Sequence, residues 1–279
     1  MNIIVNHIPF TETIPRLIHQ TYFTARLPDK LCDNVHHLRA LNPSWEYLFW
    51  DDMSIASFIG QHYGHKMLVI FNSINPDYGA ARADLFRYLV LYRLGGVYLD
   101  IKSAADVPLD QVIRPDDSFI LSQWRNGVGE PYEGWGLHLD LRDIPRGEYQ
   151  QWHIIASPGH PLLRAVIERV TSNLQSYRYD KSGFGRLGVL RLTGPIAYTK
   201  AIHPLLCSYP HRIVEDQSEL GFRYSIFEND GRQYHHKVLK NHYAAMITPI
   251  VKRPFPYSFI NYIFYKARAY KLYRYRFGK

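Results

Sequence analysis

Cysteine is scarce in this sequence: the 279-residue chain contains only Cys32 and Cys207. Two isolated cysteines cannot build a disulfide framework, and neither belongs to a closely spaced pair of the kind that binds a metal ion. The composition therefore excludes the class of small disulfide-stapled domains, and a reducing compartment is the simplest expectation.

Long apolar runs are also missing. No stretch approaches 18 consecutive apolar residues, so we expect no transmembrane helix. The first 20 residues lack a basic segment followed by an apolar segment and a small-residue cleavage site, which argues against a secretory signal. The sequence therefore predicts a cytoplasmic protein.

Acidic residues are absent from the last part of the chain. Residues 231–279 hold 11 of the 33 Lys and Arg residues and none of the 25 Asp and Glu residues. Aromatic residues alternate with these basic ones, which suits an anionic membrane surface, nucleic acid, or a helix packed on the domain with a solvated basic face. We favour the membrane surface over nucleic acid. The prediction is a domain over 1–250 and a basic aromatic extension over 251–279 that holds the protein at the inner face of the membrane.

Segments typical of strands and of helices alternate along the chain. Strands are predicted at 13–23, 45–52, 97–100 and 117–124, and helices at 29–42, 53–64, 75–96, 159–174 and 193–202. Gly64 is expected to end the second helix, and Thr193 is a candidate cap for the last one. This alternation predicts a single α/β domain with a mostly parallel sheet, in which ligands bind beyond the carboxyl ends of the strands.

Three charged residues mark a candidate site. Asp84 and Arg87 are three residues apart on an otherwise apolar helix, so they share a face, and Asp100 follows the next strand. One interpretation is a buried ion pair that ties helix to sheet. The other is a binding site, because an arginine fork binds phosphate or hydroxyl groups and a carboxylate accepts hydrogen bonds from sugar hydroxyls.

The segment "RADLFRYLVLYRLGGVYLD" (82–100) resembles the signature of glycosyltransferase family 32. That family includes the initiating α-1,6-mannosyltransferase of the Golgi, sphingolipid mannosyltransferases and bacterial capsule or lipopolysaccharide transferases, and the glucosylating clostridial toxins share the pattern. "IPRLIHQTYF", "NPSWEYLFWDD" and "LTGPIAYTKAI" are similar to three further family motifs. The four matches occur in order from residue 14 to residue 202.

The resemblance implies a GT-A fold that binds a nucleotide-diphosphate sugar and transfers the sugar with retention. It implies that Asp84 and Arg87 hold the donor sugar. Asp100 would be the first carboxylate of the D-x-D motif, which binds Mn²⁺ or Mg²⁺ and the ribose. The resemblance of the first predicted strand to the family motif implies three further nucleotide-binding candidates, His19, Gln20 and Tyr22.

Lys102 stands where the second D-x-D carboxylate is expected. A divalent cation prefers oxygen ligands, and an ammonium group repels it. Three accounts follow: Lys102 itself supplies positive charge to the diphosphate, Asp100 binds the metal with another group such as His242, or the site is inactive. We favour the first two, because the rest of the charged pattern is present, and assign Asp100 and Lys102 as catalytic residues.

The acceptor is expected over the segment that follows Asp100, where Trp124 and Trp135 are candidates for stacking on sugar rings. The sequence as a whole predicts a retaining glycosyltransferase that moves a hexose or N-acetylhexosamine from a UDP- or GDP-sugar to a glycan or glycolipid, in polysaccharide or lipopolysaccharide synthesis. The alternative is a catalytically weakened protein that binds nucleotide sugars or nucleic acid.

Overall fold

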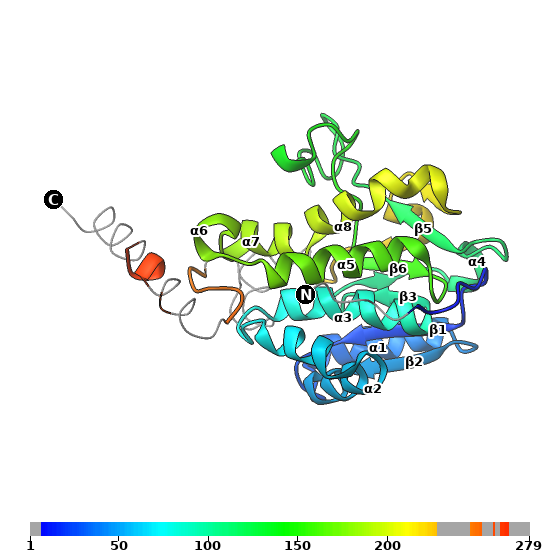
Figure 1. Cartoon of the computed structure of the whole chain (residues 1–279). Helices are drawn as coiled ribbons and strands as arrows, with labels where there is room; N and C mark the ends of the chain where they lie inside the picture. Colours follow the sequence, from blue (N-terminus) through cyan, green and yellow to red (C-terminus); the bar gives the residue numbers. More distant parts are fainter. Residues whose placement is uncertain (1–6, 228–245, 253–258, 260–262, 268–279) are drawn as a thin grey trace.

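The computed structural model describes residues 7–227, 246–252, 259 and 263–267 of the chain. Within these residues, six strands form a central sheet in the order β2-β1-β3-β6-β5-β7 (Figure 1). Of these six, β6 runs against its neighbours β3 and β5, and the other five are parallel to one another. The bounds are β1 (Leu17–Thr21), β2 (Glu46–Trp50), β3 (Gly96–Leu99), β5 (Phe119–Ser122), β6 (His153–Ala156) and β7 (Arg212–Val214). The prediction of an α/β fold with a mostly parallel sheet is confirmed.

Helices cover both faces of this sheet. One face carries α2 (Asp52–Ser73), α3 (Gly79–Leu94), α5 (Pro161–Gln175), α7 (Gly185–Leu192) and α8 (Pro195–Ile202). The other face carries α1 (Asp29–Leu41), α4 (Leu109–Val112) and a small sheet of β4 (Ala104–Ala105) and β8 (Phe222–Arg223). The short helices are α6 (Tyr179–Ser182), η1 (Leu139–Leu141), η2 (His203–Ser208) and η3 (Gln217–Leu220). Figure 1 shows α3 and α5 side by side, and together they bury the sheet face that leads to the candidate site.

Helix α2 consists of two helical stretches that meet at Gly64. It begins at a capping box, in which the side chain of Asp51 accepts a hydrogen bond from the backbone N–H of Ser54 at 2.8 Å. Gly64 was expected to end the predicted helix, and it does, because its φ of 76° and ψ of 178° break the helical backbone there. A second helical stretch, which was not predicted, follows the glycine and buries residues such as Phe71 in the core.

The Gly95-Gly96 pair between α3 and β3 is required by the backbone. Their φ angles of 70° and 101° are conformations that side-chain-bearing residues rarely adopt. A Cβ atom on Gly95 would collide with the ring of Pro158, and one on Gly96 would collide with the carbonyl oxygen of Leu17. The two glycines therefore let β3 begin in close contact with β1, directly after the helix that carries Asp84 and Arg87.

A long excursion, residues 123–152, separates β5 from β6 and projects from the body as the green segment at the top of Figure 1. It is tied back by Asp140, whose carboxylate lies 2.8 Å from Nη2 of Arg191. The backbone N–H of Tyr149 also donates to the hydroxyl of Thr199 at 2.9 Å. These contacts return the chain to the sheet immediately before β6.

The segment 246–252 packs where α2 meets α3. The backbone N–H of Asn75 donates to the carbonyl of Ile250 at 2.8 Å, and that of Lys252 donates to Ser73 at 2.7 Å. The predicted division at residue 250 stays a prediction, because most of 253–279 lies outside the described residues. In the described part of the chain, no helix has the length and apolar character needed to cross a bilayer.

Two histidines are fully enclosed on the strands of the central sheet. Burial lowers the pKa of His153 to about 3. Burial also lowers the pKa of His19 to about 4, although its hydrogen bond to the Gly95 carbonyl opposes the shift. Both folded-state pKa values lie below the unfolded value of 6.5, so the unfolded chain binds more protons in this range. The neutral histidines therefore contribute stability that is present above pH 6.5 and is lost as the pH falls.

We predict that lowering the pH from 7.5 to 5 reduces the free energy of unfolding by about 2 kcal/mol for each of these two histidines. Urea denaturation at the two pH values measures the loss. In His153→Gln, the loss of unfolding free energy between the two pH values should be smaller by the contribution of one histidine. In His37→Asn, which changes an exposed residue, the loss should be the same as in the unmodified protein. Equal slopes for His153→Gln and the unmodified protein would contradict the assignment.

Candidate functional site

The candidate site lies at the edge of the sheet where β1 and β3 end. These strands are parallel neighbours, so the residues that follow them, Tyr22 and Asp100, come out at the same edge, as predicted. Strand β6 runs in the opposite direction and begins there. The backbone N–H of Asp100 accordingly donates to the carbonyl of Trp152 at 2.8 Å.

Arg87 occupies the centre of the site and is 3% exposed. Its Nη2 donates to Oδ1 of Asp100 at 2.9 Å and lies 3.3 Å from Oδ1 of Asp84. Its Nη1 donates to the carbonyl and to Oε1 of Gln151 at 2.6 and 2.8 Å. Burial alone would lower the pKa of Arg87, but the carboxylates, Asp100 foremost, outweigh it and raise the pKa. One buried cation thus joins α3, the end of β3 and the start of β6.

Asp84 faces the same centre from the preceding turn of α3. Its Oδ2 accepts from the hydroxyl of Thr193 at 2.8 Å, and its Oδ1 accepts from Nε2 of Gln151 at 3.1 Å. Burial raises the pKa of this carboxyl, while Arg87 and the two hydrogen bonds act in the opposite direction. Asp84 and Arg87 are therefore a buried ion pair embedded in a hydrogen-bond network, which is the first of the two interpretations offered by the sequence. Binding of a donor sugar by these two residues stays a prediction.

Asp100 is the part of this network that faces solvent. Its side chain is 24% exposed, compared with 4% for each of Asp84 and Arg87. The Tyr98 hydroxyl lies 3.4 Å from Oδ1 of Asp100 and 3.0 Å from the hydroxyl of Thr21. Because Oδ1 is held by the protein, the carboxylate has a fixed orientation and presents its outer oxygen to the surroundings.

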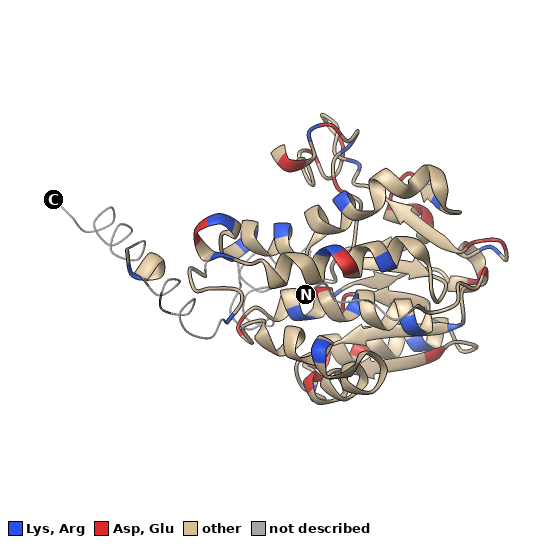
Figure 2. Cartoon of the chain, in the orientation of Figure 1, with Lys and Arg blue, Asp and Glu red and all other residues tan. Residues whose placement is uncertain are grey.

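Charged groups are uncommon in the interior of this molecule. In Figure 2 the strands are drawn almost entirely in the colour of uncharged residues, and charged residues gather on the helices and loops around them. Burying a charge is costly unless it is paired and hydrogen-bonded. The buried Asp84–Arg87 pair is therefore stable only if the surrounding residues satisfy the hydrogen-bonding groups of both side chains.

The nucleotide candidates on β1 have internal partners. Nε2 of His19 lies 2.9 Å from the Gly95 carbonyl, and its Nδ1 accepts from the indole of Trp50 at 3.2 Å. Gln20 is completely buried and donates to the carbonyl of Asp100 at 3.3 Å. These contacts use both ring nitrogens of His19 within the protein, and they make Gln20 a support for the backbone of Asp100. A direct contact of either side chain with a nucleotide stays a prediction.

Tyr22 follows β1 and is 8% exposed. It packs in a small apolar cluster with Leu31, Val35, Ile101 and Phe227. Tyr22 thus lies beside the turn that follows Asp100, and its stacking on the donor base stays a prediction. His242, the second candidate metal ligand, lies outside the described residues.

Lys102 does not point toward a carboxylate among the described residues. Its ammonium nitrogen lies 3.4 Å from the centre of the Tyr224 ring, a cation–π contact, and the residue is 9% exposed. The D-x-D motif that this segment resembles binds a divalent metal. Here one oxygen of Asp100 is bound to Arg87, an ammonium replaces the second carboxylate, and the described residues contain no group of three metal-binding side chains. The described residues therefore do not fit a divalent metal.

The acceptor candidates belong to an aromatic cluster around Tyr224. Trp124 is 4% exposed, and its indole donates to Glu148 at 2.8 Å, so its ring is enclosed. Trp135 is 45% exposed and lies edge-on to Trp124 and Tyr224. Of the two predicted residues, Trp135 is thus the one whose ring is open to a sugar.

Two residues of the network were not identified from the sequence. Gln151 binds both Asp84 and Arg87, but the residues around it in the sequence do not indicate this role. Thr193 was predicted to cap α8, and that prediction was wrong, because Gly194 occupies the cap position and the Thr193 hydroxyl binds Asp84. Its place in the "TGP" motif was the available signal.

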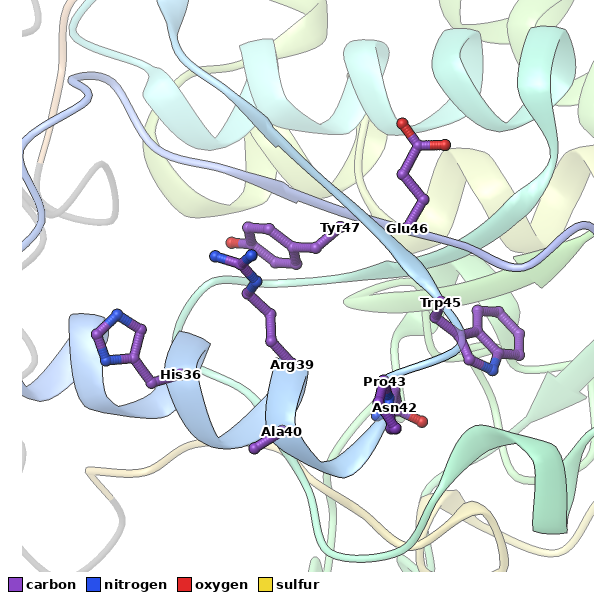
Figure 3. A pocket seen from close by; sticks show the side chains of 8 residues that line it. All are labelled: His36, Arg39, Ala40, Asn42, Pro43, Trp45, Glu46 and Tyr47. Atoms are coloured by element: carbon purple, nitrogen blue, oxygen red, sulfur yellow. The ribbon is translucent and has the colours of Figure 1, made fainter.

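A separate hollow of about 610 Å³ lies between the end of α1 and the start of β2. Figure 3 shows Arg39 lying over the ring of Tyr47, with Trp45 and Glu46 along the strand. Because β2 is parallel to β1, its start lies at the edge of the sheet opposite to Asp100. The hollow therefore contains no member of the charged network.

Comparisons with known proteins identify the region around the network. Residues 28–119, which include Asp84, Arg87, Asp100 and Lys102, match the family model "Glycosyltransferase sugar-binding region containing DXD motif". Residues 28–119 of this chain are similar to a glycosyltransferase sugar-binding region. The match confirms the predicted likeness to family 32, and activity as a glycosyltransferase is a proposal that this likeness supports.

Curated relatives agree with this assignment. The chain is 36% identical to inositol phosphoceramide mannosyltransferase 3 of Schizosaccharomyces pombe, with 67% of this chain and 44% of the relative covered. It is 28% identical to the initiation-specific alpha-1,6-mannosyltransferase of the same organism, with 70% and 49% covered. The chain thus spans less than half the length of either relative. Among solved structures, the UDP-bound glycosyltransferase domain from the YGT toxin matches with a TM-score of 0.47 and 9% identity, covering 80% of this chain and 83% of that one.

We predict that Thr193→Val, which keeps the shape and removes the hydroxyl, lowers the free energy of unfolding by about 1–3 kcal/mol. The reason is that a buried carboxylate oxygen of Asp84 loses its donor. Urea denaturation measures the change, and Thr193→Ser, which retains the hydroxyl, is the matched control. If valine is tolerated as well as serine, the hydrogen bond to Asp84 does not stabilise the site.

Proposed function

We propose that this protein transfers a sugar from a nucleotide-diphosphate sugar to a hydroxyl group of a glycan or glycolipid. The observation that carries the proposal is the buried Arg87, which holds Asp84 and Asp100 at the carboxyl edge of a mostly parallel sheet. That edge is where α/β folds bind ligands, and Asp84, Arg87 and Asp100 lie within the matched region of residues 28–119.

The donor would meet two charged groups at this edge. The outer oxygen of Asp100 can accept hydrogen bonds from hydroxyl groups of the sugar or the ribose. Lys102 can place positive charge near the diphosphate, which becomes more negative as the bond to the sugar breaks. Asp84 and Arg87 are enclosed in the protein, and the hydrogen bond from Arg87 fixes the orientation of Asp100. We also propose that Asp84 or Arg87 contacts the donor sugar.

We propose transfer with retention of configuration. The bond between the sugar and the diphosphate breaks, the acceptor oxygen bonds to the same face, and the leaving phosphate oxygen takes the acceptor proton. Such a reaction needs positioning and charge stabilisation more than a protein base. The described network fits that need, because Asp100 is oriented by Arg87 and Tyr98 rather than paired with a histidine.

The donor sugar and acceptor are proposed from chemistry and likeness together. The relatives are named mannosyltransferases, which makes mannose the first donor sugar to test, beside other hexoses and N-acetylhexosamines supplied as UDP- or GDP-sugars. The exposed ring of Trp135 suits a sugar of the acceptor. A lipid-linked or polysaccharide acceptor at the inner face of a membrane agrees with the basic aromatic tail of the sequence.

The test is sugar transfer, or slow donor hydrolysis, measured with a panel of UDP- and GDP-sugars. We expect turnover by the unmodified protein and a loss of about 100-fold or more in Asp100→Asn, because an oriented charge at the reacting centre is removed. Asp106→Asn, which changes an exposed carboxylate of the same segment, should retain the rate. Donor binding without turnover would replace the proposal with the alternative of a nucleotide-sugar binding protein.

We further predict that turnover is retained in EDTA, because Lys102 supplies the positive charge. Lys102→Met should lower kcat/KM by about 100-fold. Lys102→Asp, which restores the D-x-D pattern, should be equally weak in EDTA and should regain activity when Mn²⁺ is added. Complete inhibition of the unmodified protein by EDTA would show that a metal, and not Lys102, supplies the charge.

A further inference from the structure

The backbone of the turn that carries Lys102 is held from two sides. From α1, the buried side chain of Asn34 donates to the carbonyls of Ile101 and Ser103 at 3.2 and 2.8 Å. From the segment after β8, the backbone N–H of Ile226 donates to the carbonyl of Lys102 at 2.8 Å. These bonds fix the point from which the Lys102 side chain starts.

The same segment places Tyr224 against the lysine. The hydroxyl of Ser103 donates to the carbonyl of Tyr224 at 2.8 Å, and Ala104 pairs with Arg223 in the small antiparallel sheet. The ammonium of Lys102 then lies over the Tyr224 ring at 3.4 Å from its centre. These backbone contacts, and not the side-chain rotamers alone, place Tyr224 next to Lys102.

Three tryptophans fix the plane of the Tyr224 ring. The ring centres of Trp124, Trp135 and Trp152 lie 5.3, 5.7 and 5.5 Å from that of Tyr224, at interplanar angles of 83°, 88° and 72°. Near-perpendicular packing of this kind is a favourable arrangement of aromatic rings. The three tryptophans thus hold the Tyr224 ring in one orientation, with its face against the ammonium of Lys102.

The buried ammonium of Lys102 needs a compensating interaction, and the Tyr224 ring provides one. An ammonium that is largely removed from water is unfavourable without compensation, and within the described residues Lys102 makes no ion pair. The negative face of an aromatic ring provides compensation without neutralising the charge. The N–H groups that point away from the ring remain donors for an anion such as a phosphate oxygen.

We propose that Tyr224 is a positioning residue that holds the ammonium of Lys102 ready for the donor diphosphate, in place of the second carboxylate and its metal. The inference rests on the proposed function, since it assigns to Tyr224 the placement of a charge that the transfer reaction uses. A carboxylate at position 224 would pair with the lysine and cancel its charge, whereas a ring leaves the full charge available.

The first test compares Tyr224→Phe with Tyr224→Leu in donor-dependent turnover. Phenylalanine keeps the ring face and should retain kcat and the donor KM within about twofold, whereas leucine should raise the donor KM about tenfold, as expected for the loss of about 1.4 kcal/mol of interaction. Phe222→Leu, on the adjoining strand β8, is the matched control, because this buried ring contacts Trp152 and His153 and not Lys102. Equal KM values for the leucine and phenylalanine variants would overturn the inference.

The second test reports on the contact without any donor. Lysines are labelled by reductive methylation with ¹³C, and the Lys102 signal is assigned by its loss in Lys102→Met. We expect an upfield ring-current shift that persists in Tyr224→Phe and Phe222→Leu and disappears in Tyr224→Leu. An unshifted signal in the unmodified protein would overturn the inference even if transfer is observed. A shifted signal with no binding or turnover of any donor would instead refute the proposed function and leave the contact standing.

Discussion

The structure of the candidate site depends on the burial of one guanidinium group. Arg87 is enclosed by Asp84, Gln151, Tyr98 and the edge of the sheet, and it reaches the partly exposed Asp100 at 2.9 Å. An enclosed cation is tolerable only when its donors are satisfied, so each neighbour has to be placed to suit it. The reversal of β6, the glycine pair before β3 and the turn before α8 all serve this placement.

The consequence for chemistry is a division of labour between enclosed and exposed charge. Asp84 and Arg87 have nearly all of their hydrogen-bonding capacity used within the protein, whereas Asp100 is partly exposed. Lys102 is 9% exposed, and its ammonium lies on an aromatic ring and makes no ion pair within the described residues. That arrangement differs from a D-x-D site built for a divalent cation, because the positive charge belongs to the chain itself.

Much of the site was visible in the sequence because its signals are local. Asp84 and Arg87 share a helix face at a spacing of three residues, and Asp100 follows an apolar strand that a glycine pair introduces. Contacts between distant segments left no such signal. Gln151 and Tyr224 reach the site only through β6 and β8, short strands whose pairing partners no periodic pattern identifies.

The sequence by itself determined the fold class, the order of the main elements and the replacement of a carboxylate by Lys102. These follow from periodicity, glycine positions and residue type, which are properties of short segments. Only the tertiary structure decided that the chain becomes helical again beyond Gly64, that Thr193 binds Asp84, and that Lys102 lies on Tyr224. The physical reason is common to all three: burial and long-range hydrogen bonds set the conformation, and both exist only once distant segments have packed together.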